Sequence, residues 1–223
     1  MSFEVIIRVC GLSGIIASIG VMTGDILYFG RKESYNEYSI NKRAIGLPFW
    51  RISAGKTLGV CLIPIVTLGF VPVYFALKPS GIAIALITST LLGYAFAIGS
   101  SGHSFVAYSS IIFRAREGKS DTSPIVKTLD TILTDYKKLF TVEAIILITA
   151  FCIGSCIYSI LILTGKTYLP MWMAVINPFI LMLIARSSYK WLPSFIAGYV
   201  HPICMYIGVT PLQVLTIIYM WNK

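Results

Sequence analysis

Six long apolar stretches take up most of this sequence, and they constrain the fold more than any motif does. An α-helix needs about 20 apolar residues to cross the hydrocarbon core of a bilayer. The stretches lie near residues 9–30, 54–77, 81–113, 141–164, 170–185 and 195–221, and the fifth is the shortest. The sequence therefore predicts an all-α, polytopic membrane helix bundle with about six transmembrane helices.

Composition supports the same class of protein. Only 12% of the 223 residues are charged, against about 25% in a typical soluble domain. The longest polar segments, 31–53 and 114–140, are too short to build a core of their own. We therefore expect a single integral membrane domain over residues 1–223. The first stretch lacks a basic n-region followed by a small-residue cleavage site, so we expect a retained helix.

The basic residues gather in three loops that share one face of a six-span bundle. These loops hold Arg31, Lys32, Lys42, Arg43, Arg51, Lys56, Arg114, Arg116, Lys119, Lys127, Lys137, Lys138, Arg186 and Lys190. By the positive-inside rule this face is cytoplasmic, and both termini are then non-cytoplasmic. The positive charge serves orientation and contact with anionic lipids, and we expect no nucleic-acid partner.

The tryptophans and one amphipathic segment fit this arrangement. Trp50, Trp172, Trp191 and Trp221 fall at predicted span ends, as in an aromatic belt. Residues 125–140 carry apolar side chains at helical spacing, after a Ser123-Pro124 start signal. They predict a cytoplasmic amphipathic helix that either lies on the lipid surface or extends the fourth span. This segment is either an ordinary connector helix or a regulatory element.

Ionisable residues inside the spans are the first candidates for a functional site, because such groups are costly in lipid. They are Asp25, His103, Glu143 and His201. The predicted topology places all four in the cytoplasmic leaflet at similar depth. We therefore expect them to converge on one polar cavity open to the cytoplasm, with Asp25, His103 and His201 as catalytic residues and Glu143 as a ligand-binding residue.

Each candidate also has a structural interpretation. Asp25 lies near the headgroups, where Arg31 or Lys56 would pair with it. Glu143 suits the N-terminus of a helix, where the helix dipole favours a carboxylate. The His201 imidazole would satisfy the backbone carbonyl that the following proline frees. His103 is flanked by small residues that let another helix or a ligand approach.

Three further polar residues complete the predicted ligand-binding set. Asn177, before Pro178 in the fifth span, either lines the cavity or clamps two helices together. Ser104 and Tyr108 would add hydroxyl groups from the third span. A packing role is the alternative for the tyrosine.

We expect no metal and no cofactor. Cys152 and Cys156 are one helical turn apart, but no histidine or carboxylate lies close to them in the sequence, which favours apolar packing. The sequence also lacks a P-loop, a dinucleotide fingerprint, an HExxH motif and a Gly-x-Ser-x-Gly elbow.

Four segments carry a resemblance that covers most of the chain. They are Gly24-Asp25-Ile26-Leu27-Tyr28, Phe49-Trp50-Arg51, the glycine-rich stretch that ends in His103, and Tyr168-Leu169-Pro170-x-Trp172-Met173 followed by Asn177-Pro178. The chain resembles a poorly characterised group of bacterial six-span membrane proteins, which implies the bacterial inner membrane and no particular activity. The Gly24-Asp25 pair also resembles lysoplasmalogenase-type membrane hydrolases, but their second intramembrane aspartate is missing.

These observations predict a lipid-directed intramembrane hydrolase, in which Asp25 orients a histidine and His103 or His201 acts as the general base. The alternatives are a non-catalytic carrier or receptor for a small amphiphile, and a structural interaction protein. The expected partners are membrane lipids and a small amphiphilic ligand.

Overall fold

Helices make up nearly all of the part of the chain that the computed structural model describes, which is residues 2–30, 47–116, 119–120, 123–221 and 223. No strand occurs in these ranges. The main elements are α1 (Phe3–Phe29), α3 (Phe49–Val66), α4 (Phe70–Leu77), α5 (Ile82–Arg116), α6 (Pro124–Leu163), α7 (Pro178–Ser187), α8 (Ser194–Val200) and α9 (Cys204–Met220). The all-α prediction is confirmed for the described residues. The basic residues Arg31, Lys32, Lys42 and Arg43 lie outside them.

Four helical segments are long and apolar enough to cross a membrane. They are Glu4–Phe29, Phe49–Ser80, Ile82–Arg116 and Pro124–Leu163. They overlap the first four predicted spans, and the fourth begins at Pro124 instead of near residue 141. The second of them joins α3 to α4 through a 3₁₀ turn at Thr67–Gly69.

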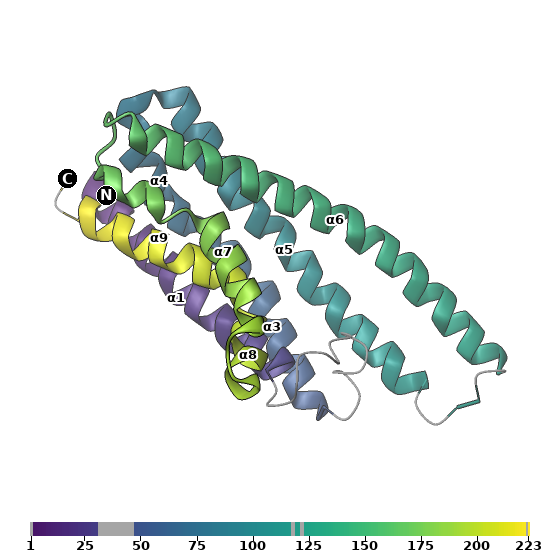
Figure 1. The fold of residues 1–223 in the computed structure, drawn as a ribbon. Coiled ribbons are helices and arrows are strands. Elements are labelled where there is room, and N and C mark those ends of the chain that lie inside the picture. Colours follow the sequence, from purple (N-terminus) through teal and green to yellow (C-terminus); the bar gives the residue numbers. More distant parts are fainter. Residues whose placement is uncertain (1, 31–46, 117–118, 121–122, 222) are drawn as a thin grey trace.

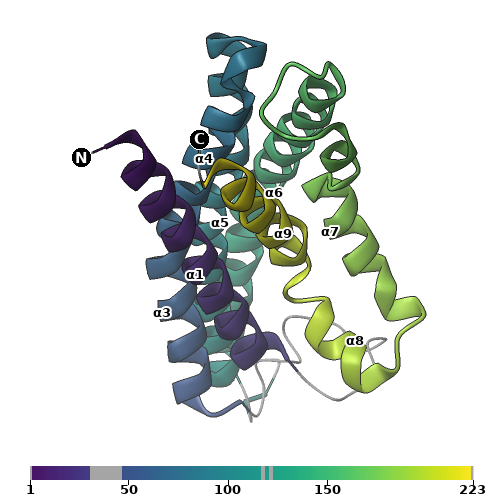
Figure 2. The ribbon, with the colours of Figure 1, turned by 90° about the vertical axis from the view of Figure 1, so that its left-hand side faces the viewer.

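The fifth and sixth predicted spans are interrupted. In the fifth, the 3₁₀ segment Met171–Val175 precedes α7, which starts at Pro178. In the sixth, residues 201–203 form turns between α8 and α9 (Figure 2). Proline lacks a backbone N–H and clashes with the preceding turn, so Pro178 and Pro202 favour these breaks. α7 and α9 are apolar but too short to span alone.

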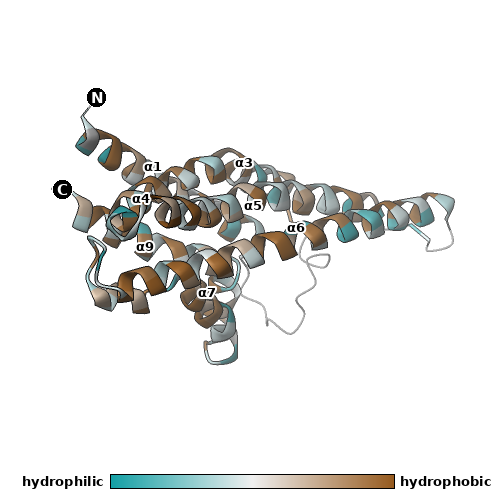
Figure 3. Ribbon diagram, turned by 90° about the horizontal axis from the view of Figure 1, so that it is seen from above, coloured by the Kyte–Doolittle hydropathy of each residue, from teal (hydrophilic) through white to brown (hydrophobic). Residues whose placement is uncertain are grey.

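The predicted amphipathic segment 125–140 forms the first part of α6. α6 has 40 residues, which is about 60 Å of helix and about twice the thickness of a bilayer core. α5 and α6 therefore extend past the other helices as a long hairpin (Figures 1 and 3). The helical prediction for this segment agrees with the structure, while its position on a lipid surface stays a prediction.

Helices α1 and α3 approach each other closely because both carry glycine at their crossing. A Cβ atom added to Gly55 would lie 2.9 Å from the Gly24 carbonyl oxygen and 2.8 Å from the Tyr28 Cβ atom. Small residues allow such close packing of apolar helices. The crossing brings the Asp25 turn of α1 beside α3.

Apolar side chains cover much of the outer surface, as in proteins surrounded by lipid. Ile16, Ile145, Ile160 and Val175 are among the most exposed large residues. Hydrophobic residues run along most helices, and hydrophilic residues are frequent at the far end of the α5–α6 hairpin (Figure 3). The two termini lie at one end of the molecule (Figure 1), and the C-terminal ends of α5 and α7 lie at the opposite end.

Candidate functional site

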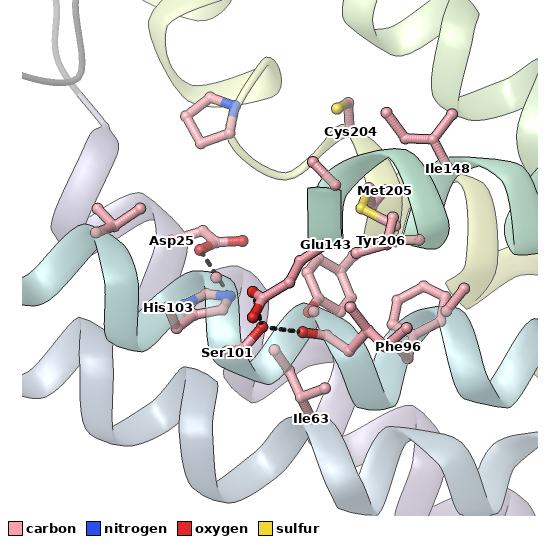
Figure 4. Close-up of a pocket in the computed structure, with 18 of the residues that line it drawn as sticks. Asp25, Ile63, Phe96, Ser101, His103, Glu143, Ile148, Cys204, Met205 and Tyr206 are labelled. Atoms are coloured by element: carbon pink, nitrogen blue, oxygen red, sulfur yellow. Dashed lines mark hydrogen bonds and ion pairs between the residues drawn. The ribbon is translucent and has the colours of Figure 1, made fainter. Parts of the chain in front are cut away.

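A cavity of about 280 Å³ lies between α1, α3, α5, α6, α7 and the start of α9. Asp25, His103, Glu143 and His201 all contribute to its lining. The rest of the wall is largely apolar, and Figure 4 shows the polar side chains gathered beside this apolar surface. The structure thus brings together four ionisable residues that are far apart in the sequence.

Asp25 and His103 form the most buried polar pair of the cavity. The Nε2 atom of His103 lies 3.7 Å from an Asp25 carboxylate oxygen, and the side chains are only 16% and 6% exposed. This separation suits an ion pair but is too long for a direct hydrogen bond. Figure 4 shows the two groups facing each other.

The position of the His103 ring depends on Gly59 of α3. A Cβ atom at Gly59 would overlap the Nδ1, Cγ and Cε1 atoms of the imidazole. The ring therefore packs its Nδ1 edge against the backbone of α3, which leaves Nε2 on the side of Asp25. Sequence reasoning missed Gly59. The signal was a glycine inside an apolar helix, which often marks a close approach.

A second polar pair joins α5 to α6. Ser101 Oγ lies 2.6 Å from a carboxylate oxygen of Glu143 and 2.6 Å from the carbonyl oxygen of Ile98. A hydroxyl has one hydrogen to donate. Ser101 therefore shares its one hydrogen between the Glu143 carboxylate and the Ile98 carbonyl. Glu143 therefore supplies a second carboxyl group to the same cavity as Asp25.

His201 reaches the cavity from the break between α8 and α9. Its side chain is half-buried, and the following Pro202 also lines the cavity. The helix interruption thus places a histidine and a non-helical backbone at the cavity wall. In membrane proteins, such irregular backbone occurs where it is buried in protein or lines a cavity.

Arg186 is another lining residue that sequence reasoning missed as a site residue, because it was counted only as an orientation charge. It lies in the last turn of α7, four residues after Met182, which also lines the cavity. Residues four apart share one face of a helix. Met182 is buried and Arg186 is exposed, so this face of α7 runs from the interior of the cavity to its mouth.

The three remaining candidates do not line this cavity. Asn177 clamps two helices, as its second interpretation predicted. Its side-chain oxygen accepts hydrogen bonds from the backbone N–H groups of Phe179 and Ile180, both 3.0 Å long. Its side-chain nitrogen donates to the Ser155 carbonyl and to the Ser159 hydroxyl of α6, both at 2.9 Å.

Tyr108 and Ser104 also lie outside the cavity lining. The Tyr108 hydroxyl accepts a hydrogen bond from Lys56 at 3.3 Å, and the same ammonium group lies over the tyrosine ring. Lys56 is thus engaged away from Asp25, which disfavours one of the structural interpretations of that carboxylate. The other proposed partner, Arg31, lies outside the described residues.

The sequence profile of a family of unknown function (DUF6796) matches residues 1–223, and the chain belongs to this family. No curated protein and no solved structure matches the chain. The expected membership of an uncharacterised family is confirmed. The weaker likeness to lysoplasmalogenase-type hydrolases finds no support in these comparisons.

Proposed function

We propose that this protein is an integral membrane protein that binds a lipid-like amphiphile in its cavity and hydrolyses it. One observation carries the proposal: the Asp25–His103 pair and the Ser101–Glu143 pair line the same largely apolar cavity. Apolar walls with a few convergent polar groups are typical of small-molecule sites. Acid–base groups at such a place are the usual requirement for hydrolysis.

In the proposed topology the chain crosses the membrane six times. The interrupted segments 170–185 and 195–221 are the fifth and sixth spans, with their breaks sheltered inside the bundle. The basic turns face the cytoplasm, and both termini face the other side. Residues 125–140 are then a cytoplasmic extension of the fourth span, in a bacterial inner membrane.

The proposed nucleophile is a water molecule held beside Asp25 and His103. Two groups 3.7 Å apart leave room at their side for one water that contacts both. The water donates one hydrogen bond to the Asp25 carboxylate and gives its other proton to His103 Nε2. Its oxygen then forms a bond to the electrophilic carbon of the substrate. The Asp25 carboxylate stabilises the imidazolium so formed.

Glu143 is the proposed proton donor to the leaving group. The bond from the substrate carbon to the leaving oxygen breaks, and this oxygen takes a proton from the Glu143 carboxyl group, which the Ser101 hydroxyl holds in place by a hydrogen bond. His103 then releases its proton to solvent, and the Glu143 carboxylate takes up a proton from solvent, which restores both groups. The sequence-based hypothesis instead gave Glu143 a ligand-binding role.

A non-catalytic carrier for the same amphiphile is the second candidate. The observation that favours it is the interruption between α8 and α9, where His201 and Pro202 line the cavity. Many transporters place their binding sites beside broken helices near the bilayer midplane. Binding of ligand without turnover would identify the carrier.

The test is incubation of the purified protein in detergent with a panel of single-chain lipids, with products identified by mass spectrometry. We expect hydrolysis of at least one lipid class and a loss of about 100-fold or more in His103→Gln. A bound lipid that is never cleaved would reject the hydrolase in favour of the carrier. Neither binding nor cleavage of any lipid would reject both.

A further inference from the structure

We infer that the ligand carries a phosphate headgroup and a single acyl chain, and that Arg186 binds the phosphate at the cavity mouth. The inference rests on the proposed function, because it treats the cavity as the ligand site. It adds the chemical class of the ligand and assigns a specificity role to a residue outside the acid–base groups.

The first observation is the state of the Arg186 side chain. Among the residues that the structure describes, its guanidinium has no hydrogen-bond or ion-pair partner. The other described arginines are all engaged: Arg8 with the Trp221 carbonyl, Arg51 with the Leu27 carbonyl, Arg114 with the Leu47 carbonyl and Arg116 with Asp130. A guanidinium on a cavity wall therefore has its donors available for a ligand.

The second observation is where this guanidinium lies. Asp25 is buried in the cavity, whereas Arg186 and the lining residue Ile148 of α6 are exposed. The cavity therefore opens between α6 and α7, with the arginine at the opening. In the proposed orientation α7 ends toward the cytoplasmic face, so the arginine lies where lipid headgroups enter.

The charges in the cavity also determine which end of the ligand lies at the mouth. A phosphate beside Asp25 would be repelled by its carboxylate, whereas Arg186 attracts it at the mouth. An arginine fork matches the geometry of phosphate oxygens and binds them through paired hydrogen bonds. The hydrolysable bond and the acyl chain then point inward, toward His103 and the apolar wall.

The volume of the cavity and the proposed hydrolysis narrow the chemical class of the ligand further. At about 280 Å³ the cavity is at the low end of small-molecule sites, which favours one acyl chain over two. A free fatty acid is also anionic, but it has no bond to hydrolyse. A single-chain phospholipid has one acyl chain, which suits the cavity volume, and an ester bond that can be hydrolysed.

The experiment measures equilibrium binding of lysophosphatidate, of monoacylglycerol with the same acyl chain, and of inorganic phosphate to the detergent-purified protein. We expect lysophosphatidate to bind about tenfold or more tightly than monoacylglycerol. Arg186→Gln should remove this preference, and Arg186→Lys should retain part of it. Lys190→Gln is the matched control, because Lys190 is exposed near the same helix end but does not line the cavity.

Three results would overturn the inference. The first is equal binding of the two lipids by the unmodified protein. The second is an equal loss in Arg186→Gln and Lys190→Gln, which would show general attraction to a basic surface. The third is binding of inorganic phosphate as strong as that of the lysolipid, which would identify free phosphate as the ligand.

Turnover measured on the same samples separates this inference from the proposed hydrolysis. Headgroup preference without cleavage would keep the phosphate site and reject the hydrolase. Cleavage without preference would keep the hydrolase and reject the phosphate site. Thermal unfolding of each variant checks the fold, which we expect to be unchanged because Arg186 is exposed.

Discussion

Asp25 is the residue on which most of the interpretation depends. It is almost fully buried in a largely apolar helix, and the His103 imidazole lies at ion-pair distance from it. A buried carboxylate without a favourable environment is costly. A protein that only needed a helix at this position would be more stable with an apolar residue there, so we propose a functional role for the pair.

Replacing Asp25 by Asn tests this role, because the amide keeps the shape and removes the charge. We expect binding or turnover to fall by about 100-fold or more, with the thermal midpoint in detergent within a few degrees of that of the unmodified protein. Asp130→Asn is the control. Asp130 pairs with Arg116 at 3.0 Å on the exposed hairpin, and such pairs contribute little to stability. A destabilised Asp25 variant with full activity would assign a structural role.

Gly59 offers a second test of the Asp25–His103 pair, because it packs against the edge of the His103 ring that faces away from Asp25. The added methyl group in Gly59→Ala would occupy the place of the His103 ring, so we expect the ring to move and activity to fall. Alanine is about 1 kcal/mol better than glycine in a helix, so stability need not fall with activity. In Gly93→Ala the new Cβ atom would meet only ordinary contacts at 3.7 and 3.8 Å. The two variants should therefore differ in turnover, and equal turnover would contradict the role of Gly59.

At the scale of elements, polar clamps hold the interrupted helices in place. Asn177 caps α7 and ties it to α6 through four hydrogen bonds. Gln213 of α9 donates to the Val66 carbonyl at 3.1 Å, next to the 3₁₀ turn of the second span, and accepts from Ser18 of α1 at 3.0 Å. In an apolar surrounding these bonds satisfy the backbone groups that the helix breaks expose.

Asn177→Ala should destabilise the protein without touching the cavity chemistry. The loss of an N-cap and of interhelical bonds costs about 2 kcal/mol, which lowers the thermal midpoint by about 4–8 °C in a chain of this size. Asn177→Ser keeps a capping oxygen and should lose less. Equal midpoints for the unmodified protein and the alanine variant would show that the clamp contributes nothing.

At the scale of the whole molecule, the proposed sidedness follows from the ends of the bundle. The termini lie at one end and the C-terminal ends of α5 and α7 at the other (Figures 1 and 2). All four tryptophans are exposed. The order of the helices assigns Trp172 and Trp221 to the end of the bundle that holds the termini, and Trp50 and Trp191 to the opposite end. Exposed tryptophans near both ends suit the two interfaces of a bilayer.

Labelling of introduced cysteines tests this topology. Lys119→Cys and Lys166→Cys would be made separately in a protein whose own five cysteines are replaced by serine. In inverted and right-side-out vesicles, we expect a membrane-impermeant reagent to reach the two positions from opposite sides. Labelling of both positions from the same side would contradict the six-span arrangement.

The sequence by itself determined the helical class, the four long apolar helices and the places where proline interrupts the later ones. These features depend on local quantities, namely the length of an apolar run and the missing N–H of Pro178 and Pro202. The membrane depth of Asp25 and His103, which we infer from their distance to the span ends, stays a prediction.

Only the tertiary structure decided which side chains share the cavity. The contacts of Ser101 with Glu143, of Gly59 with His103 and of Asn177 with α6 depend on how each helix is rotated about its axis. The same holds for the placement of Arg186 at the cavity mouth. A continuously apolar helix carries little sequence signal for that rotation, because lipid and a packed neighbour both accept apolar side chains. Packing between helices far apart in the sequence sets it instead.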